Sequence, residues 1–441
     1  MSKGKGGKRV IEVDALARVE GEGALYVRLK GDRIEQLRFS IYEPPRFFEA
    51  LLEGRDYSDA PDITARICGI CPVAYLLGSS QAMESILGLA VSPEVRALRR
   101  LIYCGEWIAS HVLHVFFLHA PDFLGYDDAI AMAKDHPEMV KDALRLKKIG
   151  NALLETIGGR AVHPVNLKVG GFYSVPERER LLTLRDDLTW GMETARALTL
   201  RVSSFDFPTL EQDYCCVSLH HPDEYAITEG RLVSDRGLDI PIDAFEQHFD
   251  ETHVDHSTAL HGRMRGREAP YLVGPLARYN NNREQLSDSA RALAEAAGLG
   301  ARVANPFKSI VVRMVEVFYA FEEALRLVDG WTPPAAAAVE GPVRAGQGSG
   351  CTEAPRGICY HRYVLDREGR ILKARIVPPT SQNQPQMEAD LRALVQRNLA
   401  LPDDELQWLC EQNIRNYDPC ISCATHFLRL TVERDARSTR A

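Results

Sequence analysis

The sequence predicts an α+β protein that is predominantly helical, in which a central helix bundle is flanked by small β-sheets. Two observations support this fold class. Segments with apolar residues at helical spacing fill the middle of the 441-residue chain, whereas segments that alternate apolar and polar residues lie near its two ends. The sequence contains no internal repeat. We therefore expect one α+β unit and not a string of separate domains.

Each predicted element follows from a local pattern. Residues 9–42 alternate apolar and polar side chains around a Gly31-Asp32 turn, which predicts a small antiparallel sheet. Helical spacing then dominates, apart from a segment at 203–282 that is rich in Pro, His and Asp and is expected to hold short strands. The predicted helices are 46–55, 73–89, 93–118, 127–134, 138–156, 177–202, 286–298, 306–329, 386–398 and 403–415.

The last third of the chain adds further strands. Residues 332–350 are rich in Pro, Ala and Gly, which is a linker-like composition. Beyond them, alternation predicts strands from Tyr360 to Leu365 and from Ile371 to Val377. Sheets are therefore expected at both ends of the chain.

The composition excludes several classes of protein. Hydrophobic residues make up 45% of the chain and charged residues 26%, which is typical of a globular protein and not of a disordered or collagen-like one. Asp and Glu outnumber Lys and Arg by 61 to 53, so the basic excess of a nucleic-acid-binding protein is missing. The N-terminus lacks the apolar core of a secretory signal, and no stretch reaches the ~20 apolar residues of a transmembrane helix. We expect a cytoplasmic protein without a transmembrane segment.

Two C-x-x-C motifs, one near each end, are the strongest chemical signal. They contain Cys68 and Cys71 in R-I-C-G-I-C-P, and Cys420 and Cys423 in D-P-C-I-S-C-A-T-H. Four thiolates favour zinc, iron, nickel or copper(I). A structural zinc site, a catalytic metal site and a redox-active dithiol all fit these residue types. The motifs lie more than 300 residues apart, whereas zinc modules usually close a loop of tens of residues.

Six sequence words, in order along the chain, resemble the large, catalytic subunit of nickel–iron hydrogenases. Two are the cysteine motifs themselves. The others are R-V-E-G at 18–21, G-R-A-V-H-P at 159–164 followed by two glycines, E-A-P-R-G at 353–357 and P-P-T-S-Q-N at 378–383. The resemblance implies the hydrogenase large-subunit fold and the reversible heterolytic cleavage of H2 to protons and electrons.

This resemblance also implies a nickel–iron centre on the four cysteines. Cys68 and Cys420 would bind nickel alone, whereas Cys71 and Cys423 would bind both nickel and iron. The iron would also carry carbon monoxide and cyanide ligands. Soft thiolate donors suit such a centre.

Three further residues acquire catalytic roles by the same resemblance. Glu20 is expected to relay the proton beside Cys420, although a lone Glu on a strand is most often a solvated surface residue. Arg356 is expected to lie over the metals as a fixed cation that contacts cyanide, with a structural ion pair as the alternative. Asp418 would accept a hydrogen bond from Arg356 or cap the following helix.

The resemblance assigns a magnesium site to Glu49, to the backbone carbonyl of Arg375 and to His426. Carboxylate and carbonyl oxygens suit Mg²⁺, whereas His is a less usual ligand. Two positions depart from many relatives, because Tyr75 replaces a His and Ser110 aligns with an Asp near the metals. Both departures are similar to the cytoplasmic, sulfhydrogenase-like branch of the family.

Isolated residues receive simpler interpretations. His111 and His114 lie one helical turn apart and fit either the polar surroundings of the metals or an ordinary structural role. The six remaining cysteines are expected to be buried small hydrophobes. They are Cys104, Cys215, Cys216, Cys351, Cys359 and Cys410.

The electrons from H2 are expected to leave through other subunits. The chain has no further cysteine motif for an iron–sulfur cluster and no G-x-G-x-x-G nucleotide motif. The resemblance implies an iron–sulfur small subunit and, in the cytoplasmic branch, flavin- and NAD(P)-binding diaphorase subunits. Alternatives to the enzyme are a hydrogen-sensing subunit, a structural zinc protein and a quinone-binding respiratory relative. The cysteine pairs argue against the respiratory relative, and the C-terminal extension argues against the sensor.

Residues 427–441 resemble an extension that a maturation endopeptidase removes once the metals are bound. Cleavage is then expected between His426 and Phe427, and the resemblance implies that residues 1–426 form one large-subunit domain. A permanent C-terminal helix is the alternative, because Phe427, Leu428 and Leu430 are apolar.

Overall fold

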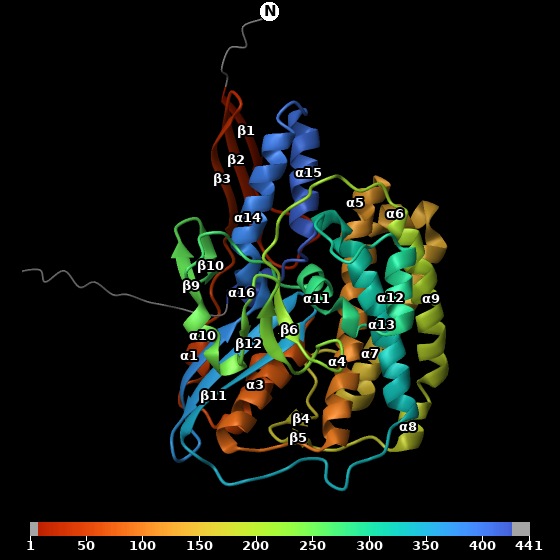
Figure 1. The fold of residues 1–441 in the computed structure, drawn as a ribbon, viewed down its shortest axis with the longest axis vertical. Coiled ribbons are helices and arrows are strands. Elements are labelled where there is room, and N and C mark those ends of the chain that lie inside the picture. Colours follow the sequence, from red (N-terminus) through yellow and green to blue (C-terminus); the bar gives the residue numbers. More distant parts are fainter. Residues whose placement is uncertain (1–7, 426–441) are drawn as a thin grey trace, which may run out of the picture.

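The computed structural model describes residues 8–425 and confirms the predicted α+β class (Figure 1). A helix bundle lies on one side of the molecule, and small antiparallel sheets lie on the other. Buried apolar side chains form a continuous cluster from the N-terminal sheet through the bundle to the C-terminal helices. The bundle consists of α4 (Pro93–Leu113), α7 (Pro137–Gly158), α9 (Arg185–Ser203), α12 (Asp288–Ala296) and α13 (Ser309–Asp329).

Helices α4 and α7 cross closely because glycines face each other. A Cβ atom on Gly150 would lie 2.8 Å from the carbonyl oxygen of Gly105, so any larger residue would push the helices apart. Helix α4 leads through a π-helical turn (His114–His119) into α5 (Ala120–Leu124). The stretch Pro93–Leu124 is apolar and long enough to cross a membrane, but 83% of its most apolar window is buried inside the protein.

Two three-stranded antiparallel sheets form from the N-terminal and C-terminal parts of the chain. The N-terminal sheet comprises β1 (Lys8–Val13), β2 (Gly23–Lys30) and β3 (Arg33–Ile41), as predicted for residues 9–42. The second sheet comprises β11 (Gly346–Ala354), β12 (Gly357–Leu365) and β13 (Ile371–Val377), and α3 (Pro72–Leu87) packs on it.

The glycines of residues 332–350 belong partly to this sheet and not to a linker. Strand β11 begins at Gly346, within the linker-like stretch. A Cβ atom on Gly350 would lie 2.2 Å from the carbonyl oxygen of Gly78 in α3. Glycine is therefore needed for the close approach of the strand to the helix.

Residues 203–282 hold short strands, as predicted. They form a sheet of β6 (Val217–His220), β7 (Arg231–Ser234) and β8 (Asp239–Ile240), and a hairpin of β9 (Phe249–Val254) and β10 (Ser257–Met264). Smaller elements complete the described part of the chain. They are α1 (Phe48–Leu52), α2 (Ala60–Ala65), α6 (Ala129–Asp135), β4 (Leu167–Lys168), β5 (Gly171–Phe172), α8 (Arg178–Leu182), α10 (Phe245–His248), α11 (Pro275–Asn282), and single 3₁₀ turns at Tyr57–Asp59, Ile242–Ala244, Arg283–Gln285 and Pro306–Lys308.

The C-terminal helices differ from the prediction at one boundary. Helix α14 (Pro379–Arg397) begins a full two turns before residue 386 and contains Pro385, which we expected to precede the helix. Hydrogen bonds to distant backbone stabilise these first turns, because Gln382 donates to the carbonyl of Ile358 (2.8 Å) and Asn383 accepts from the amide of Val273 (2.9 Å). Helices α15 (Asp403–Arg415) and α16 (Ile421–Ala424) follow.

The predicted helix at 177–202 is in fact two helices. Helix α8 ends at Leu182, and α9 starts at Arg185 after a short break. The predicted helix at 46–55 is likewise shorter, because only α1 is helical there.

The N-terminal and C-terminal parts of the described chain meet where Glu20 and Cys420 form a parallel β-bridge.

Candidate metal centre

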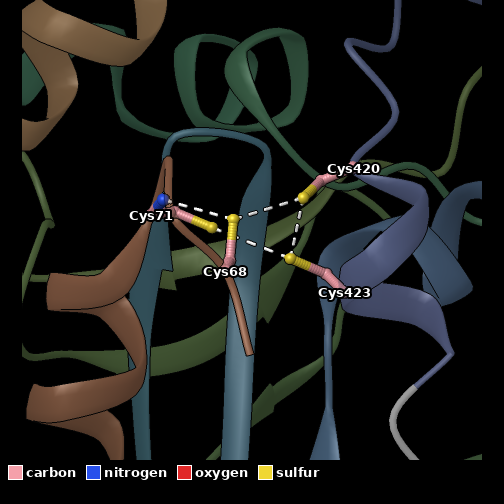
Figure 2. A group of neighbouring side chains, drawn as sticks. All are labelled: Cys68, Cys71, Cys420 and Cys423. Carbon is pink, nitrogen blue, oxygen red and sulfur yellow. Dashed lines mark hydrogen bonds between the residues drawn. The ribbon is translucent and has the colours of Figure 1, made fainter. Parts of the chain in front are cut away.

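The four cysteines of the two C-x-x-C motifs meet in one buried cluster. Cys68 and Cys71 lie in the loop before α3. Cys420 immediately precedes the short helix α16, and Cys423 lies within it. Figure 2 shows the four side chains pointing toward one another. The Sγ atoms are 3.4 Å apart for Cys68 and Cys420, 3.8 Å for Cys71 and Cys423, and 2.8 Å for Cys420 and Cys423.

The donor set fits a thiolate-bound metal. The four sulfurs lie within 4.8 Å of one another and none forms a disulfide. Four thiolates around one ion at about 2.3 Å would be separated by about 3.8 Å. The observed separations of 2.8, 3.4 and 3.8 Å reach this value only for Cys71 and Cys423. Four thiolate donors suit soft or borderline metals, with nickel, iron and zinc among them.

Hydrogen bonds among the four cysteines favour the thiolate form of one of them. Hydrogen bonds from Cys420, Cys423 and Cys71 hold the pKa of Cys68 well below the usual thiol value. Burial raises the pKa of Cys420 and of Cys423. One thiolate is thus stabilised by its protonated neighbours, and a bound cation would take the place of those protons.

Arg356 supplies a buried positive charge at the cluster. Its Nε donates to the carbonyl of Asp418 (2.5 Å), and its Nη2 donates to the Asp418 carboxylate (3.0 Å). Burial disfavours the charge, but Asp418 and the cluster thiolates raise the pKa of Arg356 well above its usual value. The third nitrogen, Nη1, is buried without a hydrogen-bond partner in residues 8–425, so one donor is available to a group bound at the metals.

Asp418 orients this arginine. The residue adopts a left-handed backbone conformation with φ of 52°, and its side chain is buried. Of the two roles expected for Asp418, the structure shows the hydrogen bond from Arg356, whereas α16 has no side-chain cap.

Glu20 lies beside the cysteine turn, but its carboxylate contacts backbone. Its Oε2 accepts from the amide of Ser422 (3.0 Å), and its carbonyl accepts from the amide of Ile421 (3.1 Å). The backbones of Glu20 and Cys420, the cysteine beside which the relay is expected, form a parallel β-bridge. The acid is thus fixed on the turn that carries two of the thiols.

Sequence reasoning missed two residues next to Glu20. The Ser422 hydroxyl donates to Glu43 (2.8 Å), and Arg46 donates to the carbonyls of Ile67 (2.7 Å) and Ser422. Arg46 therefore links the backbones of the two cysteine motifs. No local pattern marks Glu43 or Arg46, because their partners are distant in the sequence.

The proposed magnesium ligands are brought together only in part. Glu49 accepts a hydrogen bond from the amide of Ile376 (2.7 Å), next to Arg375. The Arg375 side chain pairs with acidic side chains, including Glu246 at 3.3 Å. His426 lies outside the described residues. Glu49, Glu53, Glu251 and basic side chains from β12 and β13 line a cavity of about 210 Å³ here.

A second acid near the cluster was also missed. Glu106 in α4 is fully buried, and its carboxylate accepts from the amides of Val73 (2.6 Å) and Ala74 (3.2 Å) at the start of α3. Burial raises its pKa well above the usual value, and the nearby Cys68 adds to this shift. Its only sequence signal is a carboxylate among the apolar residues of a helix, one turn before Ser110.

The residues that depart from the family pattern are buried. The Tyr75 ring packs edge-on against His361 with centroids 5.7 Å apart, and the Tyr75 hydroxyl has no hydrogen-bond partner in the described chain. Ser110 is likewise buried with an unpaired hydroxyl within residues 8–425. His111 lies 3.0 Å from the carboxylate of Glu316, and His114 lies 2.7 Å from the carbonyl of Arg415. His111 thus contacts the bundle helix α13, and His114 contacts the end of the C-terminal helix α15.

The sequence words of the resemblance surround the cluster. Thr380 accepts a hydrogen bond from the amide of Cys420 (3.0 Å), and His163 lies 2.7 Å from the carbonyl of Ala65 just before Cys68. Arg278, which the sequence did not mark, pairs with Glu353 (3.0 Å) and with Glu316 (2.8 Å). The other six cysteines are buried, as predicted.

Comparison with known proteins agrees with this site. The family model for nickel-dependent hydrogenases matches residues 46–142 and 266–426. The alpha subunit of sulfhydrogenase 1 from Pyrococcus furiosus is 33% identical over 433 residues, which cover 95% of this chain and 98% of the relative. The beta subunit of the NAD-reducing hydrogenase from Cupriavidus necator is 27% identical over 478 residues, with 95% of each chain covered.

Solved structures support the fold independently. A crystal structure of NAD+-reducing [NiFe]-hydrogenase in the H2-reduced state superposes with a TM-score of 0.86 at 24% identity, covering 96% of this chain and 100% of the other. At this identity the likeness shows the fold alone. Together with the matched residues and the sequence relatives, it shows that the chain belongs to the nickel-dependent hydrogenase family and is an oxidoreductase acting on H2.

Proposed function

We propose that Cys68 and Cys420 bind nickel and that Cys71 and Cys423 bind nickel and iron, with carbon monoxide and cyanide on the iron. When bound, this group supplies the redox chemistry for reversible H2 cleavage. The observation that carries the proposal is the buried cluster of four sulfurs within 4.8 Å, with an unpaired donor of Arg356 available to it. No other group of four cysteines comes together in residues 8–425.

The chain's own residues manage the proton and the charge. Glu20 is half-buried and held on the cysteine turn by the Ser422 amide, where its carboxylate can accept a proton released at the cluster. Arg356 stays protonated and presents a fixed positive charge, and Asp418 holds its guanidinium in one orientation. These are the three residues to which we assign catalytic or positioning roles.

We further propose that Mg²⁺ binds next to Glu49, with His426 and the carbonyl of Arg375 as other ligands. Support comes from the carboxylates of Glu49, Glu53 and Glu251 in one cavity, since Mg²⁺ prefers oxygen ligands. Cleavage after His426 by a maturation endopeptidase would then expose a carboxyl end at this site. Residues 1–426 would form the mature domain.

The electrons are proposed to pass to an iron–sulfur small subunit and onward to NAD(P) through flavin-containing subunits in the cytoplasm. The relatives are subunits of multi-subunit enzymes, one of them NAD-reducing by name. The residues of this chain offer no cluster motif that could carry electrons to the surface.

The test is H2-dependent reduction of a viologen dye and of NAD(P)+ by the purified complex. Cys423→Ser should abolish both reactions, because an alcohol does not replace a bridging thiolate. The matched control is Cys410→Ser, which changes a buried cysteine outside the cluster and should retain activity. Dye reduction without NAD(P)+ reduction would refute only the proposed acceptor. Full activity in Cys423→Ser would refute the metal assignment.

A further inference from the structure

A second group of metal-ligating side chains lies outside the cysteine cluster. His256 lies in the turn of the β9–β10 hairpin, His261 lies in β10, and Glu388 lies in α14. One donor atom from each lies within 4.8 Å of the others. The hairpin is beside α14 and the edge of the N-terminal sheet, as Figure 1 shows.

Contacts already hold two of the three donors in place. His256 Nε2 lies 2.7 Å from Oε1 of Glu388, and the same oxygen accepts from the amide of Phe39 in β3 (3.1 Å). The His256 and His261 rings meet edge to face with centroids 5.6 Å apart. The hairpin turn and β3 thus both contact the Glu388 carboxylate of α14.

The third donor is the unusual one. His261 is only 4% exposed, and its Nε2 has no hydrogen-bond partner in residues 8–425. Buried polar atoms are rarely left unpaired, so this nitrogen calls for a partner that the side chains do not supply.

The surroundings offer access and room for a fourth ligand. A cavity of about 460 Å³ adjoins the three donors. The His256 and Glu388 side chains are about one-fifth exposed, at 19% and 21%. Arg263, Arg267 and Glu268 also line the cavity, so its charge is mixed and not that of an acidic surface cluster.

We propose that His256, His261 and Glu388 form a binding site for a borderline divalent metal ion, with Zn²⁺ as the preferred ion. Two imidazole nitrogens and one carboxylate oxygen are a common zinc donor set, with water from the cavity in the fourth position. Its imidazole and carboxylate donors separate this site from the all-thiolate cysteine cluster, which suits softer metals. An ordinary His256–Glu388 ion pair is the competing interpretation, but it leaves Nε2 of His261 unexplained.

The position of the site gives the ion a structural task. It would tie the hairpin and the N-terminal sheet to α14, and Thr380 in the first turns of α14 holds the amide of Cys420. The ion would therefore stabilise α14, the helix whose Thr380 accepts a hydrogen bond from the amide of Cys420. It takes no part in the reaction.

The experiment is a metal titration of the purified complex after removal of loosely bound ions with a chelator. Co²⁺ is the probe, because tetrahedral coordination gives it strong visible absorption, and Zn²⁺ should displace it. We expect one more equivalent of Co²⁺ per complex in the wild type than in His261→Ala or Glu388→Gln. Loss of a ligand should weaken binding by more than ~100-fold, since even loss of a supporting hydrogen bond costs up to about that much.

The control is His253→Gln, which changes an exposed histidine of the same hairpin outside the triad and should bind Co²⁺ as the wild type does. H2-dependent dye reduction shows that each variant is folded and loaded. His256→Gln provides a second ligand variant if His261→Ala does not fold. Equal Co²⁺ binding by wild type and triad variants, or no tetrahedral signal in the wild type, would overturn the site while leaving the proposed hydrogenase function untouched.

Discussion

Replacement of Glu20 by Gln isolates the proton-accepting role of this side chain. Glutamine has the same shape as glutamate. Its amide oxygen can still accept from the Ser422 amide, which lies 3.0 Å from the Glu20 carboxylate in the native chain. The backbone bridge to Cys420 does not involve the side chain. A neutral acceptor replaces a charged one, which costs roughly 1 kcal/mol, the usual difference between a charge-assisted and a neutral hydrogen bond. We therefore expect the Glu20→Gln chain to fold and to load its metals.

The effect on catalysis should be far larger than the effect on folding. A positioned acid or base typically contributes about 10²- to 10⁴-fold to the rate. This range corresponds to about 2.7–5.4 kcal/mol of activation free energy. H2 oxidation with a viologen dye should fall by this factor, and exchange of D2 with solvent protons should fall with it, because both require a proton to leave the cluster.

The matched control is Glu22→Gln, which removes an exposed carboxylate two positions away and should leave both rates unchanged. Infrared spectra of the metal ligands establish that each variant is loaded. A loaded Glu20→Gln enzyme with wild-type rates of dye reduction and exchange would refute the role assigned to this residue.

Three further changes test other parts of the site. Arg356→Lys loses the planar fork that contacts Asp418, and dye reduction should fall by at least ~100-fold in enzyme whose infrared spectrum shows bound metals. Glu316→Gln weakens the pairing of the buried Arg278 and should lower the free energy of unfolding by about 3–5 kcal/mol, seen as a lower unfolding temperature. The control Asp239→Asn, which changes an exposed ion pair with Arg231, should leave the unfolding temperature unchanged. The intact mass of the active subunit should correspond to a chain that ends at His426, and a mass that includes Ala441 would exclude cleavage.

The motifs of the sequence predicted the cysteine cluster because each half is contiguous. Cys68 and Cys71 are separated by a turn, as are Cys420 and Cys423, so local spacing places each pair. The contact between the two pairs depends on folding, and only the resemblance to the family predicts it. The same holds for Arg356 and Asp418, which are 62 positions apart and hydrogen-bonded.

Isolated residues with distant partners could not be predicted. Glu106, Arg278 and Arg46 have no local motif, and their roles appear only when α3, α13 or the second cysteine motif packs against them. Helix boundaries failed for a related reason. The polar start of α14 has a weak helical pattern and is stabilised by hydrogen bonds from Gln382 and to Asn383, with partners in other elements.

Infrared spectroscopy of the purified complex is the most direct test of a nickel–iron centre at the four cysteines. We expect cyanide and carbonyl stretching bands that shift when H2 is added, with nickel and iron each near one per large subunit beyond the iron of the clusters. Cys423→Ser should lack these bands, and Cys410→Ser should keep them. A wild-type complex without such bands, in which zinc is the metal bound at the cysteines, would contradict the assignment.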